Sequence, residues 1–115
     1  MTSGPSSPQV MLRVFARCAS PEAAPALELQ LLQALAAFPA QLRGAPERYW
    51  KMPELFEFAL TVAGAQQLPA ITGLCSQGWT DCGDDDTPSW VWNAEPGECF
   101  LHPDVAWAEV LLVDR

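Results

Sequence analysis

Residues 105–113, which read VAWAEVLLV, decide the fold class of this chain. Both alternating sets of this segment are apolar except at Glu109, and this pattern predicts an interior strand that is covered on both faces. A carboxylate buried there without a partner would cost several kcal/mol of stability. We therefore expect Glu109 either to pair with Arg13 or Arg17 of an earlier strand, or to face outward beside Trp107, which shares its strand face.

Four other short segments alternate in the same way, so the chain has about five predicted strands. They are residues 10–16, 55–62, 89–93 and 98–101. A helix is expected to begin at Pro25, because proline suits the first helical position, and to end at Pro39. Its apolar side chains share one helical face: Leu27, Leu31, Ala34, Leu35 and Phe38. These elements predict an α+β fold, mainly an antiparallel sheet with one principal helix packed on one face.

The rest of the chain is expected to form connections and a tail. Residues 64–78 are ambiguous, with a helical turn after Pro69, and residues 81–88, DCGDDDTP, have the charge and turn formers of a loop. The length of 115 residues suits a single domain over residues 10–115, preceded by a disordered tail at residues 1–9.

No segment of the sequence has the pattern of a membrane span or a secretory signal. No apolar run approaches the roughly 20 residues that cross a bilayer. The Ser/Pro/Gly-rich start also lacks a basic region followed by an apolar one. We therefore expect a cytoplasmic protein without a membrane partner, in which the four cysteines form no structural disulfide.

Charge is divided unequally between the two halves of the sequence. The formal net charge is −8; residues 1–58 hold five acids and five bases, whereas residues 59–115 hold nine acids and one base, Arg115. Such a field attracts a basic surface and repels nucleic acid and anionic membrane. The sequence therefore predicts a protein partner with a basic surface and no nucleic-acid partner.

The predicted partner-binding site lies in the acidic half, where tryptophans stand beside carboxylates as they do in protein-binding hot spots. Its members are Trp79, Asp81, Asp84, Asp85, Asp86, Trp90, Trp92, Trp107 and Glu109. Trp90 and Trp92 are two residues apart, so on a strand they share a face and either bind the partner or pack in the core. If they are core residues, Trp79 and Trp107 are the better anchors.

Two other residue sets in this half could carry chemistry. The acids of DCGDDD offer oxygen ligands for calcium, but they lack the alternate spacing and bidentate glutamate of an EF-hand loop. Cys99 and His102 have C-x-x-H spacing, and a Cys3His zinc site would also need Cys75 and Cys82, whose separation is wider than that of a zinc knuckle.

A thiol nucleophile is the second chemical possibility. Cys99, His102 and Asp104 could act as nucleophile, base and orienter, but no oxyanion site follows them. We expect no catalytic residues, no metal and no cofactor, and therefore no enzymatic activity.

The size, the acidity and the carboxyl-terminal sequence SWVWNAEPGECFLHPDVAWAEVLLVD resemble those of bacterial immunity proteins. These proteins are the inhibitors encoded beside the toxins of polymorphic and contact-dependent growth inhibition systems. The resemblance implies a tight one-to-one complex with a cognate toxin, often a basic nuclease, that is blocked at its active site or beside it. Two other classes stay open: a small thiol- or zinc-dependent enzyme using Cys99 and His102, and a structural subunit of a larger complex, which would expose a large apolar patch.

Overall fold

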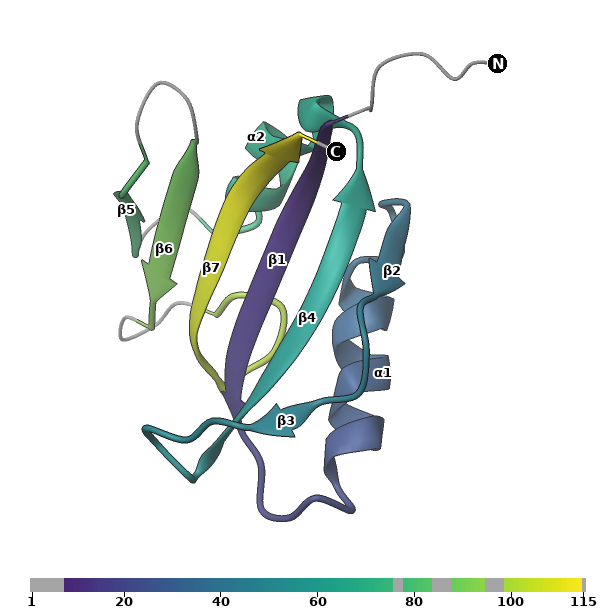
Figure 1. Ribbon diagram of the computed structural model, residues 1–115, viewed down its shortest axis with the longest axis vertical. Coiled ribbons are helices and arrows are strands. Elements are labelled where there is room, and N and C mark those ends of the chain that lie inside the picture. The colour runs from purple at the N-terminus through teal and green to yellow at the C-terminus, as the bar shows by residue number, and fades with distance from the viewer. Residues whose placement is uncertain (1–7, 76–77, 84–87, 95–98, 115) are drawn as a thin grey trace.

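The strand predicted at residues 105–113 lies inside an antiparallel sheet (Figure 1). The computed structural model describes residues 8–75, 78–83, 88–94 and 99–114. In this part of the chain the sheet has seven strands in the order β2-β4-β1-β7-β6-β5, and β3 also pairs with β4. The strands are β1 (Pro8–Arg17), β2 (Ala40–Leu42), β3 (Glu47–Arg48), β4 (Leu55–Ala63), β5 (Trp79–Asp81), β6 (Ser89–Asn93) and β7 (Val105–Asp114).

The central strand β1 pairs with β4 on one side and with β7 on the other. Alternate side chains of a strand point to opposite faces, so the apolar set of β1 lies on one side of the sheet. This set is fully buried and continues across the neighbouring strands. Its members in β1, β4 and β7 include Val10, Leu12, Val14, Phe58, Leu60, Val62, Ala108 and Val110.

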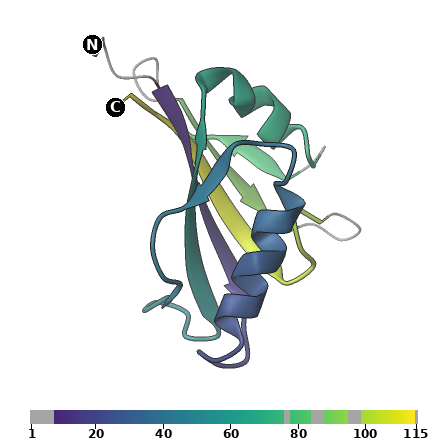
Figure 2. The ribbon, with the colours of Figure 1, turned by 90° about the vertical axis from the view of Figure 1, so that its right-hand side faces the viewer.

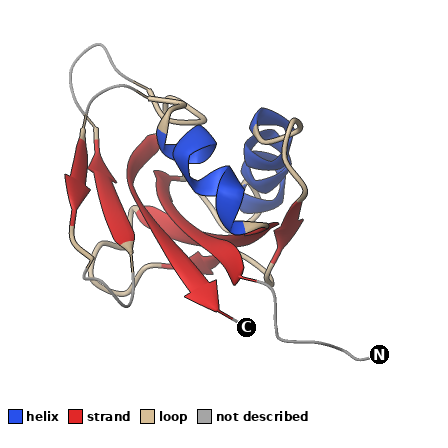
Figure 3. Ribbon diagram, turned by 90° about the horizontal axis from the view of Figure 1, so that it is seen from above, coloured by secondary structure: helices blue, strands red, loops and turns tan. Residues whose placement is uncertain are grey.

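Helices α1 (Ala24–Ala34) and α2 (Leu68–Thr72) cover this buried face, as Figure 2 and Figure 3 show. Leu27, Leu31 and Leu35 of the α1 region and Ile71 of α2 complete the core. Burial of one such side chain contributes roughly 2 kcal/mol. A short 3-10 helix, η1 (Ala65–Gln67), leads into α2. Within the described residues, no helix is long and apolar enough to cross a membrane.

The predicted fold class is confirmed: the chain is a small α+β domain with α1 packed on one face of an antiparallel sheet. Pro25 lies in the first turn of α1, as expected. The helix ends earlier than predicted, at Ala34. Ala34 is exposed, and Phe38 lies beyond the helix but still packs against the core. Strand β1 starts at Pro8, so Pro8 and Gln9 belong to the sheet instead of the tail.

One strand prediction and one loop prediction were wrong. Residues 99–101 form no strand, because Phe100 turns inward to contact Trp79 and Trp92 and Leu101 takes a positive φ of 68°. Residue Asp81, predicted in a loop, pairs with Trp90 as the end of β5. The short strands β2, β3 and β5 gave no periodic signal, because two or three residues are too few to alternate.

The prediction that residues 105–113 are covered on both faces was also wrong. Strand β7 is interior to the sheet, between β1 and β6. However, its second set of side chains, Trp107, Glu109, Leu111 and Val113, is only partly buried. The reason is that both described α-helices pack on one side of the sheet, so that no described α-helix covers the other side (Figure 3).

Candidate functional site

The side of the sheet opposite α1 and α2 forms the candidate site, and we call it the open face. The strand register places one alternating set of β1 there, together with its neighbours on β4, β6 and β7. The set comprises Gln9, Met11, Arg13, Phe15, Glu57, Ala59, Thr61, Val91, Trp107, Glu109, Leu111 and Val113.

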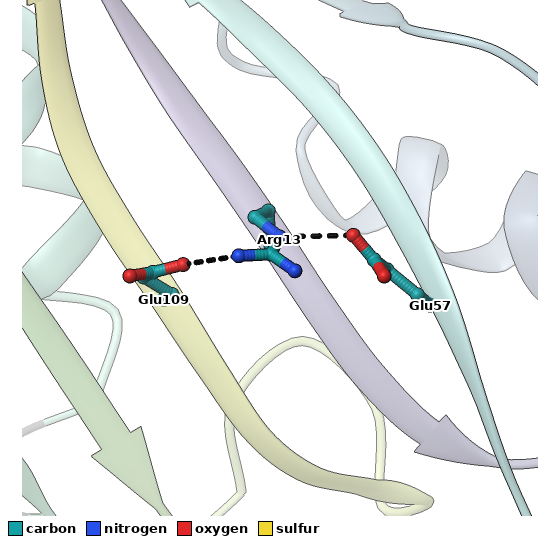
Figure 4. Close-up of polar contacts among 3 residues, drawn as sticks. All are labelled: Arg13, Glu57 and Glu109. Atoms are coloured by element: carbon teal, nitrogen blue, oxygen red, sulfur yellow. Dashed lines mark hydrogen bonds and ion pairs between the residues drawn. The ribbon is translucent and has the colours of Figure 1, made fainter. Parts of the chain in front are cut away.

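An ion triad of Arg13, Glu57 and Glu109 lies in the middle of the open face (Figure 4). Arg13 Nε donates to Glu57 Oε2 over 2.9 Å, and Nη1 donates to Glu109 Oε1 over 2.8 Å. Glu109 is directly opposite Arg13 on β7, whereas Glu57 on β4 is its diagonal neighbour. Both positions bring side chains within reach across a sheet. Glu109 therefore pairs with Arg13, one of the two arginines considered for it, and it does so on the face of β7 that also holds Trp107.

The ion triad is only partly screened by solvent. The side chains of Arg13, Glu57 and Glu109 keep 37%, 29% and 28% of their exposure. The hydrogen bond to Glu57 is the main cause that raises the pKa of Arg13, with Glu109 adding to it and burial opposing it. Two carboxylates and one guanidinium leave the triad with one net negative charge. This charge sits in a half-buried position on the open face.

An aromatic cluster lies next to the ion triad at one end of the open face. Trp107 stacks on Phe15 with ring centroids 3.9 Å apart and planes 8° apart, because the two residues are opposite each other on β7 and β1. Tyr49 meets the Phe15 ring edge-on at 4.8 Å, and Trp50 follows it at 6.4 Å from the Tyr49 ring. We use the name aromatic cluster for Phe15, Tyr49, Trp50 and Trp107.

The sequence reasoning missed Trp50, which is the most exposed of the large hydrophobic side chains in the described chain at 79%. It lies in the connection between β3 and β4, in the electrically neutral half of the sequence. A signal was present, because Trp50 lies between Pro46 and Pro53 in a segment without strand or helix periodicity that could bury it.

A hollow opens at the other end of the open face, beyond the ion triad. Its volume is about 360 Å³, and it is lined by Gln9, Met11, Arg43, Thr61 and Val113. Met11 and Val113 make part of its lining apolar, and the guanidinium of Arg43 has no ion-pair partner among the described residues. Along β1, the open face thus offers the hollow beside Met11, the ion triad with its net negative charge at Arg13, and the partly buried ring of Trp107 stacked on Phe15.

Strand register divides the predicted partner-binding residues between two faces. Trp79 pairs with Trp92, which pairs with Ala108, so both tryptophans point to the helix side. Trp92 is buried and Trp79 is half-buried, and their indole N–H groups donate to Cys75 Sγ at 3.2 Å and to the Cys75 carbonyl oxygen at 3.0 Å. Trp90 is also packed against the core from this side. Trp92 thus belongs to the core, and Trp79 and Trp90 pack against it.

Only part of the predicted site remains accessible as one surface. Trp107 and Glu109 lie together on the open face, and Asp81 is exposed at the end of β5. Asp84, Asp85 and Asp86 lie outside the described residues. Of the two alternatives left open for Trp92, the structure shows the core one, and Trp107 lies on the other side of the sheet because it has the opposite strand parity to Trp92.

The thiol and zinc alternatives receive little geometric support. Among the described residues, no three His, Cys, Asp or Glu side chains converge to hold a metal. Cys75 is buried and its Sγ accepts from Trp92, whereas Cys82 and Cys99 are exposed. The hollow that holds His102 and Asp104, about 410 Å³ in volume, is lined by Cys18 and not by Cys99.

His102 is also poorly arranged as a base. Its Nδ1 accepts a hydrogen bond from the backbone N–H of Asp104 at 3.0 Å, and the Asp104 carboxylate is 3.8 Å from the same nitrogen. In the neutral ring this places the proton on Nε2, which then donates instead of accepting. The imidazole therefore offers no free nitrogen to accept a thiol proton.

Comparisons with known proteins add no family to this geometry. No protein-family model, no curated protein and no solved structure matches the chain.

Proposed function

We propose that this chain is a cytoplasmic immunity protein that binds one basic toxin domain and neutralises it. The observation that carries the proposal is the distribution of charge across the sheet. Strands β2, β3 and β4 lie on one side of β1, and β2, β3 and the start of β4 come from the neutral half of the sequence, whereas β5, β6 and β7 come from the acidic half and lie on the other side (Figure 1). Among the described residues, the acids Asp81 of β5 and Glu109 of β7 lie on this second side of β1.

Such an arrangement favours association with a basic surface. A field that is negative along one edge steers a basic partner toward that edge and orients it during the encounter. Trp107 and Glu109 are the predicted site residues that lie on the open face of that same half. Inhibition then requires no chemistry by this chain, since coverage of the toxin's active site or of an adjacent surface is sufficient.

The two other classes account for less of the structure. The thiol enzyme would need Cys99 beside an imidazole nitrogen that can accept its proton. Instead, His102 Nδ1 accepts from the backbone of Asp104, and the hollow at His102 is lined by Cys18. The structural subunit would need one large apolar patch. The exposed large hydrophobic residues in the described chain instead come from four segments: Leu29 in α1, Leu42 in β2, Trp50 and Met52 in the connection between β3 and β4, and Leu74 after α2.

The test uses the reading frames on either side of the gene for this chain. Each is expressed in a bacterial host, alone and together with this chain. We expect one product with a basic domain to arrest growth alone, and this chain to restore growth and co-purify with that domain in a one-to-one complex. Flanking products that are all harmless, or a toxic one whose effect this chain does not relieve, would contradict the proposal.

A further inference from the structure

We infer that the open face is the docking surface for the partner and that the ion triad receives an arginine or lysine side chain from it. This inference rests on the proposed function for the basic character of the partner. It adds the place of binding and the chemistry of the central contact, neither of which follows from the acidity of the chain alone.

Arg13 engages one carboxylate oxygen of each glutamate and leaves the other oxygen of each accessible to a partner. Arg13 engages Glu57 Oε2 and Glu109 Oε1. Within the described part of the chain, Glu57 Oε1 and Glu109 Oε2 make no hydrogen bond. The two acids are held on either side of Arg13 (Figure 4) and retain one net negative charge. A second cation placed over the triad would neutralise that charge and complete its hydrogen bonding.

The ring of Trp107 lies beside the triad. Trp107 is two residues from Glu109 on the same face of β7, and one side of its ring is occupied by Phe15. The indole N–H of Trp107 has no acceptor among the described residues, unlike those of Trp79 and Trp92. A guanidinium between Glu109 and Trp107 can form an ion pair with the first and stack on the second.

The hollow next to the triad can receive an apolar side chain of the partner, because Met11 and Val113 line part of it. Met11 in its lining is two residues from Arg13 on β1, a distance of roughly 7 Å along a strand. Side chains one turn apart on a helix, or two apart on a strand, are separated by a similar distance. A partner segment that presents a cation and, at that spacing, an apolar side chain would therefore match the open face.

A second copy of this chain is a poorer occupant of the same surface. Two open faces packed against each other over Arg13 would bring together two triads of the same net charge. Like charges at the centre of an interface disfavour association. The net negative charge of the triad thus favours binding of a cationic partner and disfavours a dimer formed through two open faces.

The experiment is a titration of the full-length, 15N-labelled chain, followed by two-dimensional NMR of its backbone amides. The probe is an acetylated and amidated tri-arginine peptide at millimolar concentration and low salt. The control peptide is tri-citrulline, which has nearly the same shape without the charge. We expect saturable shifts at Arg13, Glu57, Trp107 and Glu109 with tri-arginine, and none with tri-citrulline.

Matched variants separate the ion triad from the general acidity of the chain. Glu57→Gln and Glu109→Gln each keep an oxygen that can accept from Arg13 while removing one charge. Combined, they are expected to weaken tri-arginine binding about tenfold, as the loss of a charged hydrogen bond does. Glu22→Gln removes one charge from an exposed position before α1, away from the open face, and should change affinity by less than about twofold.

Saturable shifts on the open face that the combined variant loses would support the inference. Shifts centred on β5 and β6 around Asp81, equal shifts with tri-citrulline, or the absence of saturable shifts would overturn it. None of these three results contradicts the proposed immunity function, because a toxin could still bind at the β5 edge of the sheet. If the growth-arrest test fails but the titration is positive, the cation-binding site is supported and the proposal of a toxin partner is contradicted.

Discussion

Glu28 of α1 is half-buried, and its Oε2 is buried without a hydrogen-bond partner among the described residues. Burial raises the pKa of this carboxyl above its ordinary value of 4.5. The folded state therefore binds the Glu28 proton more tightly than the unfolded state does. Glu28 thus lowers the stability of the fold once the pH rises above the raised pKa, and this cost disappears as the pH falls below 4.5.

Glu28→Gln is accordingly expected to raise the free energy of unfolding at neutral pH, because the amide removes the buried charge. The gain should shrink steadily as the pH is lowered to about 4, where the wild-type carboxyl is largely protonated. Urea denaturation across this range measures the difference, with Glu22→Gln as an exposed control. An advantage that grows toward acid pH would contradict the prediction.

Arg13 is the second residue whose change has a defined outcome. Arg13→Met leaves Glu57 and Glu109 half-buried without their shared cation, so the two carboxylates lose their charge-assisted hydrogen bonds. Because the Arg13 side chain is 37% exposed, solvent reduces the cost, and we expect a loss of about 1 kcal/mol at neutral pH. Urea denaturation measures this loss.

A mutant cycle identifies the cause of that loss. Glu57→Gln and Glu109→Gln introduced into the Arg13→Met chain should recover part of the stability, because they remove the unpaired charges. A loss that is the same with and without the glutamates would show that Arg13 contributes by packing alone.

At the scale of elements, β5 and β6 form a hairpin-like pair whose tryptophans hold it to the core. Asn93 N–H donates to the Gly78 carbonyl oxygen at 3.0 Å just before β5 begins. Gly78 has φ of 95°, and a Cβ atom there would lie 2.6 Å from the Asn93 carbonyl oxygen and 2.7 Å from Trp92 Nε1. Only glycine fits this close approach of backbone to backbone.

Gly78→Ala is therefore expected to destabilise the chain by the strain of a positive φ and, in addition, by a steric clash. Gly44→Ala is the matched control, because Gly44 has φ of 139° but nothing within 4 Å of the added Cβ. We expect Gly78→Ala to lower the free energy of unfolding by about 1–3 kcal/mol more than the control does. Equal effects in thermal or urea denaturation would contradict the clash.

At the scale of the whole molecule, the acidic half should govern how fast a basic toxin domain associates. Neutralising Asp84, Asp85 and Asp86 together is expected to lower the association rate about tenfold at low ionic strength and to leave folding nearly unchanged. Stopped-flow measurements over a salt series check this, since the difference should fade as salt is added. An association rate that does not change in the variant would remove the steering argument.

Trp107 should instead govern how long the complex lasts. Trp107→Ala removes an aromatic anchor from the open face and is expected to cost about 2 kcal/mol of binding, mainly through faster dissociation. Trp50→Ala tests whether the docking surface extends over the whole aromatic cluster. Surface-binding kinetics with the same toxin domain distinguish the two, and an unchanged dissociation rate for Trp107→Ala would place the anchor elsewhere.

Periodicity alone was sufficient for the elements that build the core. The alternation in residues 10–16, 55–62, 89–93 and 105–113 predicted β1, β4, β6 and β7, and the spacing of Leu27 and Leu31 predicted α1. These patterns are readable because each reflects burial of one face of a regular element, which is a local property of the chain. The separation of charge between the two halves is likewise a property of the sequence itself.

Only the tertiary structure decided which faces are covered. In residues 105–113 both alternating sets are apolar apart from Glu109, so the sequence had no means of showing that one face would stay open. That outcome depends on α1 and α2 packing on the same side, a long-range arrangement. It placed Trp92 in the core and Trp107 on the open face, and it brought Glu57, Arg13 and Glu109 together from three strands. Strand parity is written in the sequence, but the side on which the helices pack is settled by the packing of the whole chain.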